Sequence, residues 1–270
     1  MRKVMLVGLG AISQALIPLL HGQPGLRLQG VLVRDPEAVK IKAALAHLQA
    51  SLGLELLASA RQPYPRADLL VECAGHGAIT EHVLPALAAG IPCVVTSVGA
   101  LSAPGLIDRL EAAARAGDSH FQLVSGAIGA IDALAAARLG GLHSVVYTGT
   151  KPALSWRGTP ADALLDLAAL QQPTTFFEGS ARAAAQAYPQ NANVAATVGL
   201  AGLGLDATRV RLVADPQATA NTHQVHAIGS FGEFELTMRG KPLAGNPKTS
   251  ALTVFSVARA VLNHARPLVI

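Results

Sequence analysis

Gly8-Leu9-Gly10-Ala11-Ile12-Ser13 is the stretch that decides the fold, and it directly follows the apolar run Lys3–Val7. Its spacing is G-x-G-x-x-G with serine in the third position. In this pattern the first glycine permits a tight turn, the second lets the backbone approach a pyrophosphate, and the third keeps helix and strand close. The order predicts a strand, a phosphate-binding turn and a helix. The residues expected to contact a dinucleotide there are Gly8, Gly10, Ala11 and Ile12.

The pattern of residues 1–125 continues this unit. Short β-branched runs predict strands at Lys3–Val7, Leu28–Val33, Leu69–Cys73, Cys93–Thr96 and Phe121–Val124. Amphipathic stretches rich in alanine and leucine predict helices at Ala11–Leu20, Pro36–Ala50, Ile79–Ala89 and Ala103–Ala116. Strands that alternate with helices are typical of a parallel sheet covered by helices. We therefore predict an α/β fold whose residues 1–125 form a Rossmann-type dinucleotide-binding domain.

The pattern changes at Gly126. A predicted helix at Ile131–Leu139 precedes strands expected at Ser144–Thr150, Thr174–Glu178, Arg209–Val213, Thr222–Ile228 and Glu233–Met238. Alternation of apolar and polar residues in the last strand is typical of a sheet with one face on helices and the other available to a subunit partner. Residues 126–248 are thus predicted to form an α+β domain with a mostly antiparallel sheet, for substrate, catalysis and oligomerisation. A helix within residues 249–265, from Thr249 to His264, is expected to pack back on the first domain.

The end of the second strand carries residues of both kinds that distinguish dinucleotides. Asp35 would bind the ribose 2′-hydroxyl of NAD, whereas Arg34 would accommodate the 2′-phosphate of NADP. The alternative is that both residues form a solvated turn. We expect NAD or NADP as the cofactor, without a preference.

Composition excludes several classes of protein. The 270 residues are 51% hydrophobic and 14% charged, enough for two cores, and no apolar run approaches the roughly 18 residues that span a bilayer. The formal net charge of +4 is spread along the chain, which favours small anions over nucleic acid. Cys73 and Cys93 lie in apolar strands, so core packing is expected rather than a disulfide or a metal site. We expect a cytoplasmic protein without membrane or nucleic-acid partners.

Several longer stretches resemble those of L-aspartate dehydrogenases, and they extend over nearly the whole chain. Besides the glycine turn they are Ser97–Leu101, Ser125–Leu134, Lys151-Pro152, Phe177–Arg182, Tyr188–Ala196, Asn221-Thr222-His223 and Asn246–Ser250. Ser13 in place of the third glycine and Glu72-Cys73 at the end of a strand depart from the pattern. The resemblance implies NAD(P)-dependent interconversion of L-aspartate and iminosuccinate, which yields oxaloacetate and ammonia or supplies NAD biosynthesis.

The resemblance also implies roles for three residues. It places the cofactor-contacting alanine and asparagine on Ala127 and Asn193, and the active-site histidine on His223. Small residues around Ala127 would let the backbone reach the nicotinamide. Asn193 precedes an expected helix, so the alternative for its amide is a helix cap. Strand alternation puts His223 and His226 on opposite faces, and the resemblance selects His223.

A dicarboxylate substrate needs cationic or hydrogen-bonding groups, and the matching stretches offer Lys151, Lys248, Thr249 and Ser250. Lys151 could instead end a strand, and Lys248 could be a solvated residue at the start of a helix. Two other functions stay open: a related dehydrogenase acting on homoserine, an aldehyde or a dihydropyridine dicarboxylate, and a dinucleotide-sensing module without catalysis. We expect a homo-oligomer, with a homodimer favoured.

Overall fold

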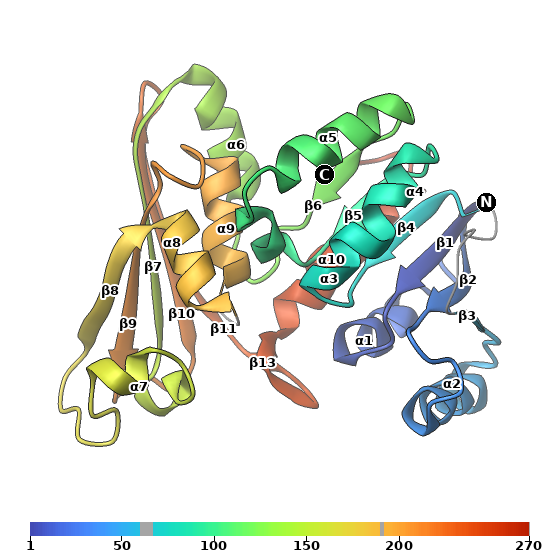
Figure 1. Cartoon of the computed structure of the whole chain (residues 1–270), viewed down its shortest axis with the longest axis horizontal. Coiled ribbons are helices and arrows are strands. Elements are labelled where there is room, and N and C mark those ends of the chain that lie inside the picture. The colour runs from blue at the N-terminus through green and yellow to red at the C-terminus, as the bar shows by residue number, and fades with distance from the viewer. Residues whose placement is uncertain (60–66, 190–191, 270) are drawn as a thin grey trace. The chain divides into compact units, whose positions relative to one another are not determined.

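The computed structural model describes residues 1–59, 67–189 and 192–269. The chain forms two compact units, one of Met1–Val124 with Thr253–Ile270 and one of Ser125–Leu252. Figure 1 shows a sheet with helices in each unit.

The first unit contains a six-stranded sheet in the order β3-β2-β1-β4-β5-β6. Its strands are β1 (Arg2–Val7), β2 (Leu26–Leu32), β3 (Leu57–Ser59), β4 (Leu69–Glu72), β5 (Cys93–Val95) and β6 (Phe121–Leu123). All neighbouring strands are parallel. The order reverses direction between β1 and β4, and ligands of such sheets bind at that switch point, beyond the carboxyl ends of the strands. The predicted Rossmann-type fold of this half is confirmed.

The helices of this unit follow the prediction in place but not in every boundary. They are α1 (Ala11–Leu20), α2 (Val39–Leu52), α3 (His76–Ala78), α4 (Leu84–Ala88) and α5 (Leu106–Ala116). The helix predicted at Ile79–Ala89 begins at His76 and contains a π-helical turn, Ile79–Val83. The one predicted from Ala103 begins at Leu106, because a 3₁₀ turn occupies Val98–Ser102 and Gly105, the N-cap, adopts φ +72°.

The carboxyl group of Glu72 joins two loops at the switch point. Glu72 is fully buried. Its Oε1 accepts hydrogen bonds from the amides of Ala74 and Gly75, both at 2.8 Å, and from the Ser97 hydroxyl at 2.8 Å. Its Oε2 accepts from the amides of Thr96 at 3.2 Å and Ser97 at 2.9 Å. Because one side chain bonds the loops after β4 and β5, the two loops hold a fixed distance from each other.

The C-terminal segment belongs partly to the first unit. Its helix α10 spans Ala251–Asn263, so the helix predicted from Thr249 starts two residues late. Thr249 and Ser250 lie instead in β13 (Asn246–Ser250), which pairs with β12 (Pro242–Leu243). The turn after α10 contacts β1 and the residue before β6: Arg2 Nε donates to the His264 carbonyl at 3.2 Å, and the His264 and His120 rings stack.

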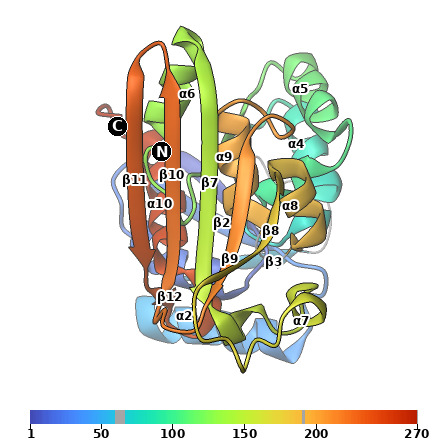
Figure 2. The same ribbon diagram turned by 90° about the vertical axis from the view of Figure 1, so that its left-hand side faces the viewer.

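The second unit contains a five-stranded sheet in the order β11-β10-β7-β9-β8 (Figure 2). Its strands are β7 (Leu142–Pro152), β8 (Thr174–Ser180), β9 (Arg209–Asp215), β10 (Asn221–Gly229) and β11 (Gly232–Gly240). Only β7 and β9 are parallel among its neighbours, which confirms the mostly antiparallel prediction. Helices cover one face of this sheet, and they are α6 (Ile131–Gly140), α8 (Ala181–Ala187) and α9 (Ala192–Ala201). The short helix α7 (Ala161–Leu164) follows β7.

The two faces of this sheet differ in composition. Along β10 the buried residues are His223, Val225 and Ala227, whereas His226 and Ile228 project to the other face. This alternation places the two histidines on opposite faces, as predicted. The face with His223 is the one that the helices cover.

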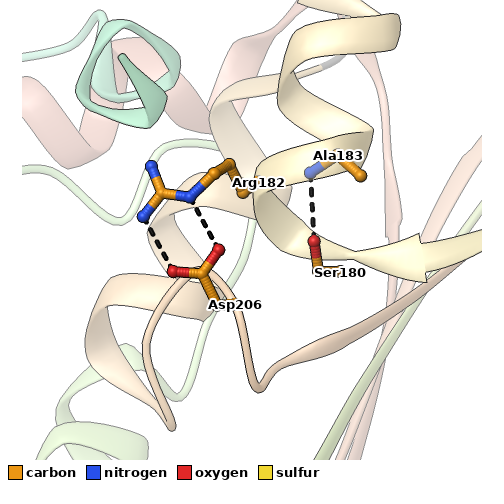
Figure 3. Close-up of polar contacts among 4 residues, drawn as sticks. All are labelled: Ser180, Arg182, Ala183 and Asp206. Carbon is orange, nitrogen blue, oxygen red and sulfur yellow. Dashed lines mark hydrogen bonds and ion pairs between the residues drawn. The ribbon is translucent and has the colours of Figure 1, made fainter. Parts of the chain in front are cut away.

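Polar contacts fix the start of α8 (Figure 3). The Ser180 hydroxyl accepts a hydrogen bond from the amide of Ala183 at 3.2 Å, which is an N-cap. Arg182 forms two hydrogen bonds to the carboxylate of Asp206, at 2.7 and 2.9 Å. Ser180 and Arg182, two polar residues of the matching stretch Phe177–Arg182, therefore have a structural role at the start of α8.

We predict that Glu72→Gln destabilises the protein by about 2–5 kcal/mol, because a carboxamide nitrogen would replace an acceptor and leave buried amide donors unpaired, each costing about 1–3 kcal/mol. Urea unfolding measures this. Glu111→Gln is the matched control, since Glu111 makes only an exposed pair with Arg115 and should change stability by less than about 1 kcal/mol. Equal stabilities of the two variants would contradict the bridging role of Glu72.

Candidate functional site

The glycine turn between β1 and α1 has the geometry of an anion site. Gly8 adopts φ +88°, and a Cβ there would lie 2.9 Å from the Ala74 side chain, so glycine is required. Gly10 is the N-cap of α1, and a Cβ there would meet nothing within 4 Å. The first amides of α1, from Ala11 and Ile12, have no intrahelical acceptor, and the first turn contains no acidic residue. This open, amide-lined turn fits a pyrophosphate.

Ser13 occupies the third motif position and is fully buried. Its hydroxyl lies beside the thiol of Cys73, whose pKa is raised mainly by burial, with a contribution from the Glu72 carboxylate that the Ser13 and Thr96 hydroxyls partly offset. A thiol with a raised pKa stays protonated and is a poor nucleophile. Cys93 is buried and its pKa is raised by burial too, and both cysteines are free.

Arg34 and Asp35 lie just beyond β2, and both are exposed. The Asp35 carboxylate accepts a hydrogen bond from the amide of Glu37 at 2.9 Å. Asp35 therefore forms the turn that was its alternative role, while a second carboxylate oxygen stays available for a ribose. The structure puts both residues at the carboxyl end of the sheet, on the side expected for an adenosine ribose.

The second unit carries a buried cluster around His223. The Tyr147 hydroxyl lies 2.8 Å from His223 Nδ1, and the two rings stack with centroids 6.1 Å apart. His223 is 6% exposed, and burial, with the charge of Lys151 as a second cause, lowers its pKa to about 4. His223 is therefore neutral at pH 7.

Lys151 extends from the end of β7 on the same face. Its Nζ lies 5.1 Å from the centroid of the Trp156 ring, a cation–π contact, and burial lowers its pKa to about 8. Trp156 is itself fixed by a hydrogen bond from Nε1 to the Val213 carbonyl at 3.1 Å. Lys151 is thus both a strand-end residue and a partly buried cation whose charge acts on His223.

The loop Ser125–Ala130 lies near this cluster. The amide of Gly129 is 2.8 Å from Met238 Sδ, and Met238 is the residue of β11 directly opposite His223. Gly126 and Ala130 both adopt positive φ angles, and strain at a residue with a side chain, as at Ala130, is concentrated at functional sites. Ala127 therefore lies in a tightly bent loop that shares Met238 as a neighbour with His223.

The other predicted residues lie farther along the unit. Asn193 is exposed and is the second residue of α9, so the prediction that it precedes the helix is wrong. Thr249 accepts a hydrogen bond from the Asn246 side chain at 3.0 Å. The Ser250 hydroxyl is buried without a partner among the described residues. The side chain of Lys248 lies outside the described residues, and its backbone is in β13, not at a helix start.

Sequence reasoning missed Tyr147, Gly149 and Glu72. Strand alternation in Ser144–Thr150 places Tyr147, Gly149 and Lys151 on one face, so this much was available from the sequence. The pairing of Gly149 with His223 across β7 and β10 was not, because the register follows from the whole sheet. Glu72 gave a signal as a charged residue in an apolar strand.

Comparisons with known proteins bear on the family. Residues 132–264 match the family described as aspartate dehydrogenase, C-terminal, and residues 8–123 match the homoserine dehydrogenase NAD binding domain. The chain is 58% identical to an L-aspartate dehydrogenase of Pseudomonas aeruginosa over 99% of both chains, and 57% identical to one of Polaromonas sp. over the full length of both. The chain belongs to the L-aspartate dehydrogenase family.

Solved structures agree on the fold. An aspartate dehydrogenase from Thermotoga maritima has a TM-score of 0.78 at 24% identity and covers 100% of this chain and 99% of its own. A hyperthermophilic archaeal homoserine dehydrogenase in complex with NADPH has a TM-score of 0.60 at 14% identity over 97% of each chain. The predicted family and its nicotinamide dinucleotide-binding domain are thus confirmed. No helix within the described residues is long and apolar enough to cross a membrane.

The pKa of His223 makes stability depend on pH. In the folded chain the pKa of His223 is about 4, whereas its ordinary value is 6.5. The unfolded chain therefore binds the proton first as the pH falls. We predict that this contribution to stability is full above about pH 6.5 and is lost as the pH falls towards 4. Urea unfolding at several pH values between 4 and 7 measures this. The free energy of unfolding of His223→Gln should depend less steeply on pH than that of the parent chain.

His226→Gln is the matched control, because His226 is on the open face, 3.4 Å from Glu233. The free energy of unfolding of His226→Gln should depend on pH as steeply as that of the parent chain. His264, whose pKa is lowered by burial, contributes to all three proteins alike. An unchanged slope in His223→Gln would show that His223 is not buried in its neutral form.

Proposed function

We propose that this chain interconverts L-aspartate and iminosuccinate with a nicotinamide dinucleotide, the imine then being hydrolysed to oxaloacetate and ammonia. The observation that carries the proposal is the buried cluster of His223, Tyr147 and Lys151 in a chain whose full length matches L-aspartate dehydrogenases. An acid/base group beside a buried cation suits an amino acid with two carboxylates.

The pyrophosphate of the dinucleotide would be held at the glycine turn of the first unit. Gly8 and Gly10 clear the approach, and the free amides of Ala11 and Ile12 bind the pyrophosphate. Ala127 and Asn193 are proposed to contact the nicotinamide end. When bound, the nicotinamide would supply the hydride chemistry at Cα of the amino acid.

His223 would exchange the protons that accompany this chemistry. Its ring is neutral at pH 7 because burial and Lys151 lower its pKa to about 4. A neutral imidazole can accept a proton from an amine or from the water that attacks the imine, and it returns that proton in the opposite direction.

Lys151 would bind one substrate carboxylate as a cation. The pKa of about 8 leaves it mostly protonated at pH 7, and burial strengthens its attraction to an anion. The Ser250 hydroxyl, buried without a partner among the described residues, and Thr249 are proposed as neutral donors to the other carboxylate, together with Lys248.

We propose further that the enzyme is a homodimer that works in the cytoplasm and supplies NAD biosynthesis. The open face of the second sheet supports a subunit contact, because Ile228 is 37% exposed on it between polar neighbours. The residues 1–125 with the C-terminal helix would act as the dinucleotide-binding domain, and residues 126–248 as the substrate domain.

The experiment that tests the function follows absorbance at 340 nm after mixing the protein with NADH or NADPH, oxaloacetate and ammonium. Sustained oxidation that requires ammonium supports the proposal. Turnover with homoserine or an aldehyde in place of these substrates would favour a related dehydrogenase, and dinucleotide binding without turnover would favour a sensing module.

We predict that Gly10→Val raises the dinucleotide Kd at least tenfold, about 1.4 kcal/mol, because the added methyl groups occupy the path of the pyrophosphate. The fold should persist, since Gly10 has φ −84° and open space around its Cβ position. Fluorescence titration measures the Kd. Gly140→Val, also in open space, is the matched control. Unchanged affinity in a folded Gly10→Val protein would show that the cofactor site has been assigned to the wrong residues.

We predict that the enzyme accepts both NAD(H) and NADP(H), and that Arg34→Ala weakens NADP(H) selectively. The loss should be about 1.5–3 kcal/mol, as expected for a hydrogen bond to a charged group. Arg27→Ala removes the same charge from an exposed position of β2. It controls for the effect that the loss of any one positive charge has on dinucleotide affinity. Equal losses of both dinucleotides in Arg34→Ala would show that Arg34 does not bind the 2′-phosphate.

We predict that His223→Ala lowers kcat on the order of 10²–10⁴-fold, as for loss of a general acid/base, while the dinucleotide Kd stays nearly unchanged. Steady-state kinetics with both substrates measure this. His226→Ala, on the opposite face of β10, should have a much smaller effect. Near wild-type turnover without His223 would remove the histidine from the mechanism and make Lys151 the next residue to test.

A further inference from the structure

The hydrogen bond between Tyr147 and His223 depends on a glycine. Tyr147 and Gly149 are two residues apart on the covered face of β7, and Gly149 is the direct partner of His223 on β10. A Cβ built on Gly149 would lie 2.7 Å from the Tyr147 hydroxyl and 3.2 Å from the ring carbon that bears it. The phenol therefore passes over Gly149 to reach His223, and the space for it exists because residue 149 has no side chain.

This arrangement engages one nitrogen of the histidine ring. The contact is 2.8 Å long and goes to Nδ1, and the near-parallel rings, 18° apart, limit rotation of the imidazole. A hydroxyl can accept from a protonated Nδ1 or donate to an unprotonated one, so the direction of this hydrogen bond and the tautomer of the ring determine each other. Only Nε2 then remains for a proton exchange.

We propose that Tyr147 is the positioning residue of His223: its hydroxyl oxygen accepts the Nδ1–H hydrogen bond, which locks the neutral imidazole in the tautomer whose unprotonated Nε2 can take a proton from the substrate, and Gly149 supplies the space that this lock needs. The proposal rests on the catalytic role given to His223 above. Hydrogen bonds from a second residue set the tautomer of a functional histidine in this way.

The described neighbours of His223 on β7, β11 and α6 leave this role to Tyr147. On β7 the groups that face it are Tyr147 and Lys151, and Lys151 acts on the ring by its charge. On β11 the opposite residue is Met238, a thioether. The buried residues of α6 are Leu134 and Ala137, which carry no polar side chain. Burial raises the pKa of Tyr147, so its hydroxyl stays protonated and neutral.

Two variants break the lock by different means. Tyr147→Phe removes the hydroxyl and keeps the ring. Gly149→Ala keeps both partners and displaces the hydroxyl. Gly140→Ala is the matched control, because the added methyl group meets nothing within 4 Å. The double variant Tyr147→Phe/Gly149→Ala tests whether the alanine acts through the hydroxyl.

The experiment measures ¹⁵N shifts of the His223 ring in the full-length protein labelled with ¹⁵N-histidine, assigned among nine histidines by the loss of one signal pair in His223→Gln. Nδ1 and Nε2 should be far apart in the parent chain and in Gly140→Ala, as in a single tautomer. They should converge in Tyr147→Phe and Gly149→Ala, as in a mixture of tautomers.

Turnover is measured on the same proteins. Both single variants should lose kcat on the order of 10–10²-fold, as for a misplaced catalytic group, with dinucleotide Kd unchanged. The double variant should be no slower than Tyr147→Phe. A single tautomer retained in both single variants would overturn the lock. Tautomer mixing with unchanged kcat would overturn the catalytic role of His223 instead, so the two failures are distinguishable.

Discussion

The buried carboxyl group of Glu72 is the interaction on which the first unit depends. It holds the loop after β4 against the loop after β5 through hydrogen bonds to four backbone amides. The first of those loops also touches the glycine turn, because a Cβ at Gly8 would collide with Ala74. Three loops at the carboxyl end of the sheet are thereby fixed together, and a dinucleotide site needs such rigidity to keep its amides aimed at one place.

In the second unit, too, a glycine leaves space for a neighbouring group. Gly8 gives room to a backbone and Gly149 gives room to a phenol, so both sites depend on a missing side chain. Gly8 has a positive φ, whereas Gly149 lies in an ordinary strand. The functional residue that follows from the second case, Tyr147, therefore cannot be recognised from a motif of glycines and must come from the register of β7 and β10.

Much of the fold could be predicted from the sequence because it follows from local patterns. Alternating strands and helices gave the Rossmann half, and period-two alternation put His223 and His226 on opposite faces. Boundaries that depend on contacts farther away were wrong: Thr249 pairs in β13 rather than starting α10, and the π turn at Ile79–Val83 has no signal in composition. The site was accessible as separate motifs, but the contact between Tyr147 and His223 joins residues 76 positions apart and needs the sheet.

The two lowered pKa values divide the proposed chemistry between His223 and Lys151. Burial acts on both groups, yet it leaves the histidine neutral and the lysine mostly charged at pH 7, because their ordinary values differ by several units. The lysine charge also opposes protonation of the ring. A substrate carboxylate that pairs with Lys151 would neutralise this charge and so raise the pKa of His223. In the proposed function, His223 would thus become a stronger base when an anionic substrate occupies the site, which ties proton transfer to binding.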